Sequence, residues 1–229
     1  MEVMFVEAHY TKEINYNEKE LRKLPARLCI TTTVTYINKL GPLVDTLKKL
    51  NKKLFFPKGR HALYPGQILG CDILAGSFKD DCDAFVYVGD GMFHPKALLL
   101  SSDKEVFVLN PLNGKLKKFD RNIITSLKKR VKGALAKFYS SSNIGVLVTT
   151  KPGQFRLSDA LALQSRFPEK NFYILMDNTF DFKSLENFPF IECFVNTACP
   201  RIAYDDSINF SRAVVNIDDV LRANDKTNN

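Results

Sequence analysis

Short apolar runs alternate with amphipathic stretches along most of the chain, which predicts an α/β fold. The β-branched stretch at 28–34 and the apolar run at 106–109 predict strands, and the continuous apolar run at 84–88 is typical of a parallel strand that is covered on both faces. Between them, apolar residues recur at helical spacing, which predicts one helix opening at Gly41 and a longer one over about 124–138. Strands and helices that alternate in this way form mainly parallel sheets.

The same succession restarts after a polar break at 140–143. The second unit is expected to contain a helix at 157–167 and a short helix at 182–187, with strands at 144–150, 172–176, 193–196 and 213–215. Each unit opens with a strand that ends in Thr-Thr, which indicates an internal duplication. We therefore predict two tandem, similar three-layer α/β domains with mainly parallel sheets, at 25–142 and 143–229.

The two ends of the chain fit this plan less well. Residues 1–8 carry apolar side chains that predict an orphan or edge strand, and the polar stretch that completes 1–24 is expected to be a connector. The last residues, 224–229, are polar and are expected to be disordered.

Composition narrows the class of protein. The 229 residues are 45% hydrophobic and carry a net charge of +8. The N-terminus is acidic and no apolar run approaches the roughly 18 residues of a membrane span, so we expect a cytoplasmic protein with no membrane partner. The lysines are scattered and not interleaved with aromatic residues, which argues against direct nucleic-acid binding. The charge indicates mainly solvated, lysine-rich surfaces, and the alternative is that it attracts an acidic protein.

Two of the five cysteines lie where a sheet could expose them. Cys199 follows the strand at 193–196 and precedes Pro200, which ends the strand, while Cys71 follows a loop rich in glycine and proline. Ligands of α/β sheets bind at the carboxyl ends of the strands, and both thiols are expected there. Free thiols act as metal ligands or simply fill space, and the residues alone leave both interpretations open for this pair.

The positions of the other cysteines and the spacing of cysteine and histidine residues limit which metal sites the chain could form. Cys29, Cys82 and Cys193 lie in or beside apolar strands and are predicted to be core residues. The chain has no C-x-x-C or H-x-x-H pair, which excludes ordinary zinc-finger chemistry. His94, in the loop 89–95, could position a substrate or move a proton, or could be a loop histidine bonded to the backbone.

Four ordered motifs carry a resemblance to a known family. They are His61-Ala62-Leu63-Tyr64-Pro65-Gly66-Gln67-Ile68-Leu69-Gly70-Cys71, Gly89-Asp90-Gly91-Met92-Phe93-His94-Pro95, Thr150-Lys151-Pro152-Gly153-Gln154-Phe155-Arg156 and Asn196-Thr197-Ala198-Cys199-Pro200-Arg201-Ile202-Ala203. Together they resemble the diphthamide synthesis family, the 2-(3-amino-3-carboxypropyl)histidine synthases of archaea and their eukaryotic relatives. The resemblance covers nearly the whole chain.

The resemblance implies a specific chemistry. Family members have three similar α/β domains, each of which supplies one cysteine to a 4Fe–4S cluster that binds S-adenosylmethionine. A 3-amino-3-carboxypropyl radical is then added to one histidine of translation elongation factor 2. The resemblance implies that Cys71 and Cys199 are the cluster ligands of the second and third domains, and we nominate three motif residues as cofactor-binding and one as substrate-side: Gln67, Gln154 and Arg156, with His94.

The chain departs from the family pattern at its start. The first family domain and its cysteine are absent, and residues 1–8 match only the end of that domain. Three explanations follow: a separate polypeptide supplies the first domain, the chain is truncated, or it is a degenerate subunit. The intact cysteine motifs favour a split synthase that needs this partner polypeptide and an electron donor and that could form a homo- or hetero-oligomer. The alternatives are a non-catalytic partner subunit and a metal-free α/β binding protein.

Overall fold

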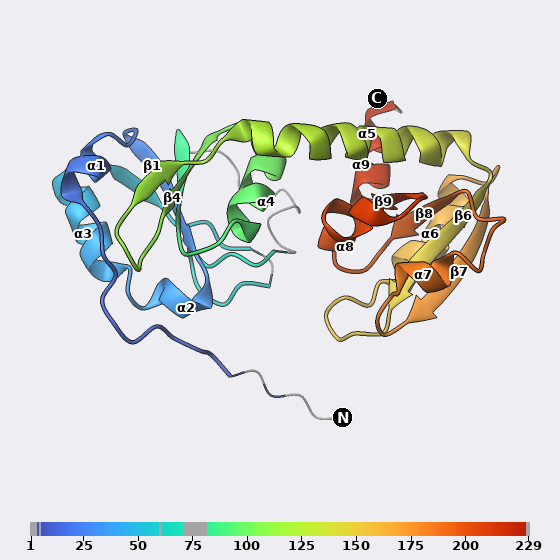
Figure 1. Cartoon of the computed structure of the whole chain (residues 1–229), viewed down its shortest axis with the longest axis horizontal. Helices are drawn as coiled ribbons and strands as arrows, with labels where there is room; N and C mark the ends of the chain where they lie inside the picture. Colours follow the sequence, from blue (N-terminus) through green and yellow to red (C-terminus); the bar gives the residue numbers. More distant parts are fainter. Residues whose placement is uncertain (1–3, 5, 60, 71–81, 228–229) are drawn as a thin grey trace. The chain divides into compact units, whose positions relative to one another are not determined.

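The computed structural model describes residues 4, 6–59, 61–70 and 82–227. The chain divides into two compact units, Met1–Ile124 and Thr125–Asn229, which follow each other from blue to red in Figure 1. Each unit is an α/β domain with its own sheet and its own core.

The first unit is built on a sheet in which four strands are parallel and the last is antiparallel. The order is β2-β1-β3-β4-β5, with β1 at Arg27–Thr32, β2 at Lys53–Phe55, β3 at Ala84–Val88, β4 at Glu105–Leu109 and β5 at Leu116–Lys118. Every residue of β3 is buried, because it lies in the middle of the sheet with side chains packed on both faces.

Helices cover both faces of this sheet. One face packs Leu28, Ile30 and Val86 against Leu43 and Leu47 of α3 (Gly41–Lys49). The opposite face packs aromatic residues of β3 against α4 (Phe93–Ser101) and the 3₁₀-helix η2 (Arg121–Ile124). Two short helices, α1 (Glu18–Arg22) and α2 (Val34–Ile37), complete the unit. The result is the three-layer arrangement that the sequence predicts.

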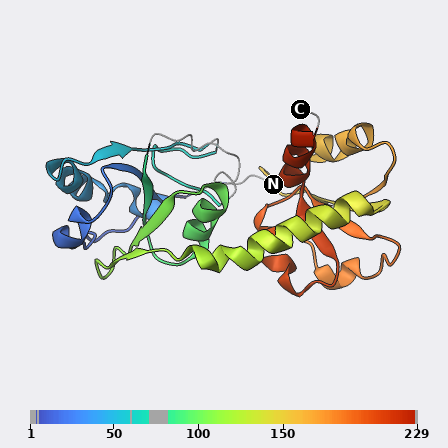
Figure 2. The same cartoon turned by 90° about the horizontal axis from the view of Figure 1, so that it is seen from above.

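The second unit has an all-parallel sheet in the order β7-β6-β8-β9. Its strands are β6 at Asn143–Thr149, β7 at Asn171–Asp177, β8 at Cys193–Asn196 and β9 at Ala213–Asn216. Helices α5 (Thr125–Ser140), α6 (Leu157–Arg166) and α9 (Ile217–Thr227) share one core with the sheet. The short helix α7 (Phe182–Leu185) lies between β7 and β8 in the chain, and α8 (Arg201–Tyr204) and η3 (Asp206–Asn209) lie between β8 and β9. In Figure 2, α6 and α9 lie side by side.

The two units share one strand order. In each, the first strand of the sheet lies between the second and the third, and the fourth follows the third. This equivalence confirms the predicted α/β class with mainly parallel sheets and fits the duplication read from the sequence. In both units the loops after the parallel strands emerge at the carboxyl ends of the strands, where Gln67, His94, Gln154 and Cys199 lie.

Several expectations for the first unit are corrected. Residues 4 and 6–8 form no strand, and Met4 and Val6 are largely exposed, because apolar alternation alone does not supply a hydrogen-bonding partner. Part of the expected connector is the helix α1. Helix α4 was not expected because Pro95 follows the Gly89-Asp90-Gly91 turn, but Pro95 lies in the first helical turn, where backbone N–H groups have no intrahelical partner.

The second unit also differs from the expectation at its ends. The division falls between Ile124 and Thr125, so α5 belongs with the second unit, where Phe138 and Ala134 pack in the sheet core. Residues 224–227 continue helix α9 and are not disordered. Within the described part of the chain, no helix combines the length and apolar character that crossing a membrane requires.

Candidate functional site

Cys199 lies on a turn that links β8 to α8. Strand β8 ends at Asn196, and Pro200 is the N-cap of α8. The Cys199 side chain is half-buried, and its backbone carbonyl accepts a hydrogen bond from the Ile202 N–H at 3.0 Å. The turn therefore holds a partly accessible thiol at the carboxyl edge of the sheet.

Two buried amide side chains fix this turn. Asn196 donates from Nδ2 to the carbonyl of Cys199 at 2.9 Å and accepts from the Ala198 N–H at 3.1 Å. The same Nδ2 donates to Oδ1 of Asn216 at 2.8 Å, and Asn216 donates in turn to the carbonyl of Pro200 at 3.0 Å. Both amides are at most 2% exposed, so the network is fully desolvated and positions the turn strongly.

Strand β6 anchors the turn from the other side. Both the backbone N–H and the hydroxyl of Thr197 donate to the carbonyl of Leu147, at 3.0 and 2.8 Å. The next loop along this edge is the Lys151 turn, in which the Lys151 N–H donates to the hydroxyl of Thr149. Since β6 and β8 are parallel neighbours, the Cys199 turn and the Lys151 turn leave the sheet at the same edge.

The remaining described cysteines are core residues, as predicted. Cys29, Cys82 and Cys193 are at most 5% exposed. Burial raises the pKa of the Cys193 thiol to about 12, which keeps it protonated and unreactive at neutral pH. Cys71, the other predicted ligand, lies outside the described residues.

The segment leading to Cys71 is described as far as Gly70. It runs beside the end of β1, because the Thr32 N–H donates to the carbonyl of Gly66 and the Ile68 N–H to the carbonyl of Thr32, both at 2.8 Å. A Cβ atom on Gly70 would lie 2.5 Å from Cε1 of Phe93. The fold therefore brings the motif that ends in Cys71 against the motif that contains His94.

Gln67 holds this segment in shape. Its side chain is 5% exposed, and its Oε1 accepts the backbone N–H groups of Leu63 and Tyr64 at 2.8 and 3.0 Å. The nomination of Gln67 as a cofactor-binding residue stays a prediction, and the contacts that the structure describes are those of a loop-fixing residue.

His94 lies in the first turn of α4 and faces Tyr87. Its Nδ1 lies 3.2 Å from the Tyr87 hydroxyl, and the two rings stack with centroids 5.6 Å apart. Burial, together with the nearby Asp90 carboxylate, raises the pKa of Tyr87. The phenol is therefore neutral and orients the imidazole; sequence reasoning missed Tyr87 because its apolar strand reads only as core.

Arg156 is engaged by carboxylates. Its guanidinium donates to both oxygens of Asp218 at 3.0 and 2.8 Å, and its Nε donates to Asp159 at 2.6 Å. These hydrogen bonds raise the pKa of the arginine, with Asp218 the larger cause. Arg156 therefore ties α6 to α9, whereas Gln154 lies half-buried in the Lys151 turn; their nomination as cofactor-binding residues stays a prediction.

A cavity of about 360 Å³ opens in the first unit beside the Gly89-Asp90-Gly91 turn. Its walls combine apolar side chains of β4 and η2 with charged groups at the rim, namely Asp90, Lys115, Lys117 and Asp120. His94 is not part of its lining. Lys117 is on β5 and Lys115 directly precedes this strand, which sequence reasoning did not expect, so no local signal pointed to the two lysines.

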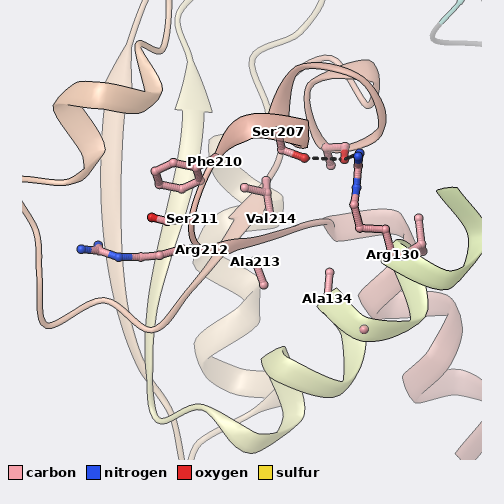
Figure 3. A pocket seen from close by; sticks show the side chains of 11 residues that line it. Arg130, Ala134, Ser207, Phe210, Ser211, Arg212, Ala213 and Val214 are labelled. Atoms are coloured by element: carbon pink, nitrogen blue, oxygen red, sulfur yellow. Dashed lines mark hydrogen bonds between the residues drawn. The ribbon is translucent and has the colours of Figure 1, made fainter. Parts of the chain in front are cut away.

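A second cavity, of about 280 Å³, lies in the second unit between α5 and the segment before β9 (Figure 3). Arg130 bounds one side, and its Nη2 donates to the carbonyls of Ala203 and Tyr204. In Figure 3 the Arg212 guanidinium extends away from Arg130, and it donates to the carbonyl of Phe188 at 2.6 Å. Both arginines satisfy backbone carbonyls, which is a structural role.

The side chains that the structure describes form no cluster of metal ligands. Among them, no three histidine, cysteine or acidic side chains gather closely enough to hold a metal ion. The Asp205 carboxylate pairs with Arg201 at 2.5 Å. Cys199 is thus a single prospective ligand on its turn.

Comparison with known proteins decides the family. The family model of diphthamide synthesis proteins matches residues 1–227. The chain belongs to this family. It is 27% identical over 205 residues to the 2-(3-amino-3-carboxypropyl)histidine synthase of Pyrococcus horikoshii, covering 88% of this chain and 58% of that protein. It is 28% identical to the synthase subunit 1 of Caenorhabditis elegans, covering 82% of this chain and 48% of that protein.

Solved structures of the family agree with the fold. The chain is similar to two crystal structures of Dph2 from Pyrococcus horikoshii, one of them with a 4Fe–4S cluster. Each match covers 91% of this chain and 60% of the Dph2 chain. The TM-scores are 0.74 at 24% identity for the cluster-bound structure and 0.76 at 25% identity for the other. The diphthamide family chain described here therefore spans between about half and three fifths of the length of these relatives.

Proposed function

We propose that this chain forms the second- and third-domain part of a 2-(3-amino-3-carboxypropyl)histidine synthase, a transferase of diphthamide biosynthesis in the cytoplasm. The observation that carries the proposal is the Cys199 turn, a half-buried thiol held by a desolvated amide network at the carboxyl edge of a parallel sheet. The family membership and the names of the relatives support the reaction class.

The described residues fit an iron–sulfur cluster in one respect, which is the fixed position of the Cys199 thiol. Thiolates are the usual ligands of such clusters, and a ligand is effective when its supporting groups fix its position. Cys199 meets this requirement, since the Asn196 and Asn216 amides hold the backbone on both sides of it. Cys71 is the proposed second ligand, and the third thiolate comes from the first-domain part, on a partner polypeptide or elsewhere in a longer chain.

The chemistry that a bound cluster would supply is one-electron reduction of S-adenosylmethionine, which would break the bond between sulfur and the aminocarboxypropyl carbon, leave methylthioadenosine and direct the 3-amino-3-carboxypropyl group toward a histidine of translation elongation factor 2. The residues of this chain position and shield the reaction. Gln67 shapes the segment before Cys71, and the neutral Tyr87 orients His94, which we assign to the substrate side. Gln154 and Arg156 are proposed to lie near S-adenosylmethionine, with Arg156 fixing the α6 terminus through Asp218.

Anaerobic reconstitution with iron and sulfide tests this proposal. The chain, mixed with the first-domain part of a family member, should acquire a cluster with an electron paramagnetic resonance signal after reduction. Cys199→Ser should abolish most of the iron content and change the signal, because oxygen is a poor ligand for this cluster. Cys193→Ala, a change in the adjoining strand, is the matched control and should leave iron content intact.

The pattern of outcomes separates the candidate functions. Loss of iron in Cys199→Ser but not in Cys193→Ala supports the cluster proposal. An iron content that is unchanged by Cys199→Ser contradicts it. A folded wild-type complex that never binds iron favours the non-catalytic partner subunit, a role consistent with relatives that are named as synthase subunits.

A further inference from the structure

The cavity of the first unit is lined by apolar side chains that remain accessible to solvent. Val108 of β4 and the nearly buried Phe119 form part of its wall, and the Phe119 N–H donates to the carbonyl of Val106 at 2.7 Å. Met92 and Ile123 line the same space and are 48% and 40% exposed. Two large apolar side chains left in water beside a cavity are typical of a place where another molecule inserts an apolar group.

Two lysines at the rim carry positive charge that the described residues do not neutralise. Lys115 directly precedes β5 and Lys117 lies within it, so their side chains leave the same face of the strand. Lys117 lies opposite Val108 in the pairing of β5 with β4, so these two residues share that face of the sheet. Lys118, on the other face, pairs with Glu105, whereas neither cavity lysine forms an ion pair within the described part of the chain.

The other polar side chains of the lining are used to shape the walls. The Asp90 carboxylate accepts the Tyr36 hydroxyl at 3.3 Å. The side chains of Asn110, Asn113 and Asp120 each accept the backbone N–H group two residues further along the chain, at 2.9, 3.0 and 2.9 Å. A small-molecule site needs convergent polar groups that orient its ligand. An apolar cavity whose available charges lie only at the rim has instead the composition of a protein–protein interface.

The cavity lies next to the residue that we assign to the substrate side. Met92, one of its lining residues, is the N-cap of α4, and His94 lies in the first turn of the same helix. The turn Gly89-Asp90-Gly91, which leads from β3 to α4, also lines the cavity. A molecule seated in the cavity therefore contacts the chain two residues from His94, which favours the protein substrate as the occupant.

We propose that this cavity docks the protein substrate through a segment in which a large apolar side chain is flanked by aspartate or glutamate. The apolar side chain enters the cavity beside Met92 and Ile123, and the carboxylates pair with Lys115 and Lys117. Pairs at the rim of an interface act mainly on the rate of association and on specificity, and salt weakens them. The choice of the elongation factor as this substrate rests on the proposed function, whereas the site depends on neither the cluster nor Cys199.

The affinity of translation elongation factor 2 for the full chain, measured by biolayer interferometry at low and at high ionic strength, tests the charged half of the site. The double variant Lys115→Glu/Lys117→Glu should weaken binding about tenfold at low ionic strength and much less at high ionic strength, because salt screens exposed charges. The matched control is Lys48→Glu/Lys49→Glu, which makes the same charge change at exposed positions of α3. It should change the affinity by less than about twofold, because the net charge alone acts only at long range.

Ile123→Ser tests the apolar half. It should weaken binding about fivefold at both ionic strengths, because the transfer of apolar surface out of water is not screened by salt. Leu161→Ser, at a 57% exposed position of α6, is the control for this change and should leave the affinity as it is. Circular dichroism verifies that each variant is folded, which is expected because every changed side chain is exposed.

The outcomes separate this site from the proposed function. Weaker binding of the factor by both cavity variants, with both controls unchanged, supports the docking site. Cavity variants that bind the factor as tightly as the wild type overturn it, as does a wild-type chain that does not bind the factor, while cluster reconstitution decides the proposed function separately. Variants that weaken binding of the first-domain part and leave the factor's affinity unchanged would assign the cavity to that part and also overturn the proposal.

Discussion

The Cys199 turn depends on a residue of the following strand, Asn216, and replacing it by alanine tests this dependence. The change removes the acceptor of the Asn196 Nδ2 at 2.8 Å and the donor to the Pro200 carbonyl at 3.0 Å. Asn216 is 2% exposed, so water does not easily replace these contacts. Asn196 keeps its bond to the Cys199 carbonyl, whereas the Pro200 carbonyl loses its amide donor.

A net cost of about 0.5–1.5 kcal/mol for each of the two lost hydrogen bonds gives about 1–3 kcal/mol for Asn216→Ala. Urea unfolding followed by circular dichroism measures the loss of stability. Alkylation of Cys199, followed by mass spectrometry, should become faster because the turn loosens, while Cys193 should stay protected. Asn187→Ala, at an exposed position in the same unit, is the control and should change stability by less than about 0.5 kcal/mol. A loss for Asn216→Ala as small as the control's would refute the claim that the amide network holds the turn.

Three further outcomes are expected. The Glu192 carboxylate accepts hydrogen bonds from the N–H groups of Asn143 and Ser142, which lower its pKa below the ordinary 4.5. Glu192 therefore stabilises the fold above pH 4.5 and loses this effect as the pH falls through the lowered pKa. Glu192→Gln should flatten that part of the pH dependence of the free energy of unfolding. Gly66 has φ +81° and a prospective Cβ 3.2 Å from the Ile30 carbonyl, so Gly66→Ala should destabilise the first unit by about 1–2 kcal/mol in urea unfolding. Gly133→Ala, in α5 with no atom near the added Cβ, should instead stabilise by up to about 1 kcal/mol, and a loss there would contradict the packing described for α5.

The sheets could be predicted because strands covered on both faces are continuous apolar runs. The 84–88 run and the 193–196 run match β3 and β8 residue for residue. Helix α4 lacks the helical spacing of apolar residues, because its apolar side chains lie on all of its sides, and Pro95 lies in its first turn. Strand β5 has only three residues, two of them lysines, and is defined by its pairing with β4.

The candidate site shows the same division between local and tertiary information. Pro200 and the apolar run before it predict the strand end that carries Cys199. The partnership of Asn196 with Asn216 depends on β9 lying beside β8, a tertiary fact that a local pattern does not contain. Likewise, Arg156 reads as a ligand candidate from its motif, and only the fold reveals that Asp218 engages it.

Transfer of a 3-amino-3-carboxypropyl group tests the central claim most directly. The reconstituted chain would be combined anaerobically with the first-domain part, a reductant, S-adenosylmethionine and translation elongation factor 2, and the factor would be analysed by mass spectrometry. The account predicts modification of one histidine that requires both parts and is lost in Cys199→Ser but kept in Cys193→Ala. Modification that persists in Cys199→Ser would contradict it.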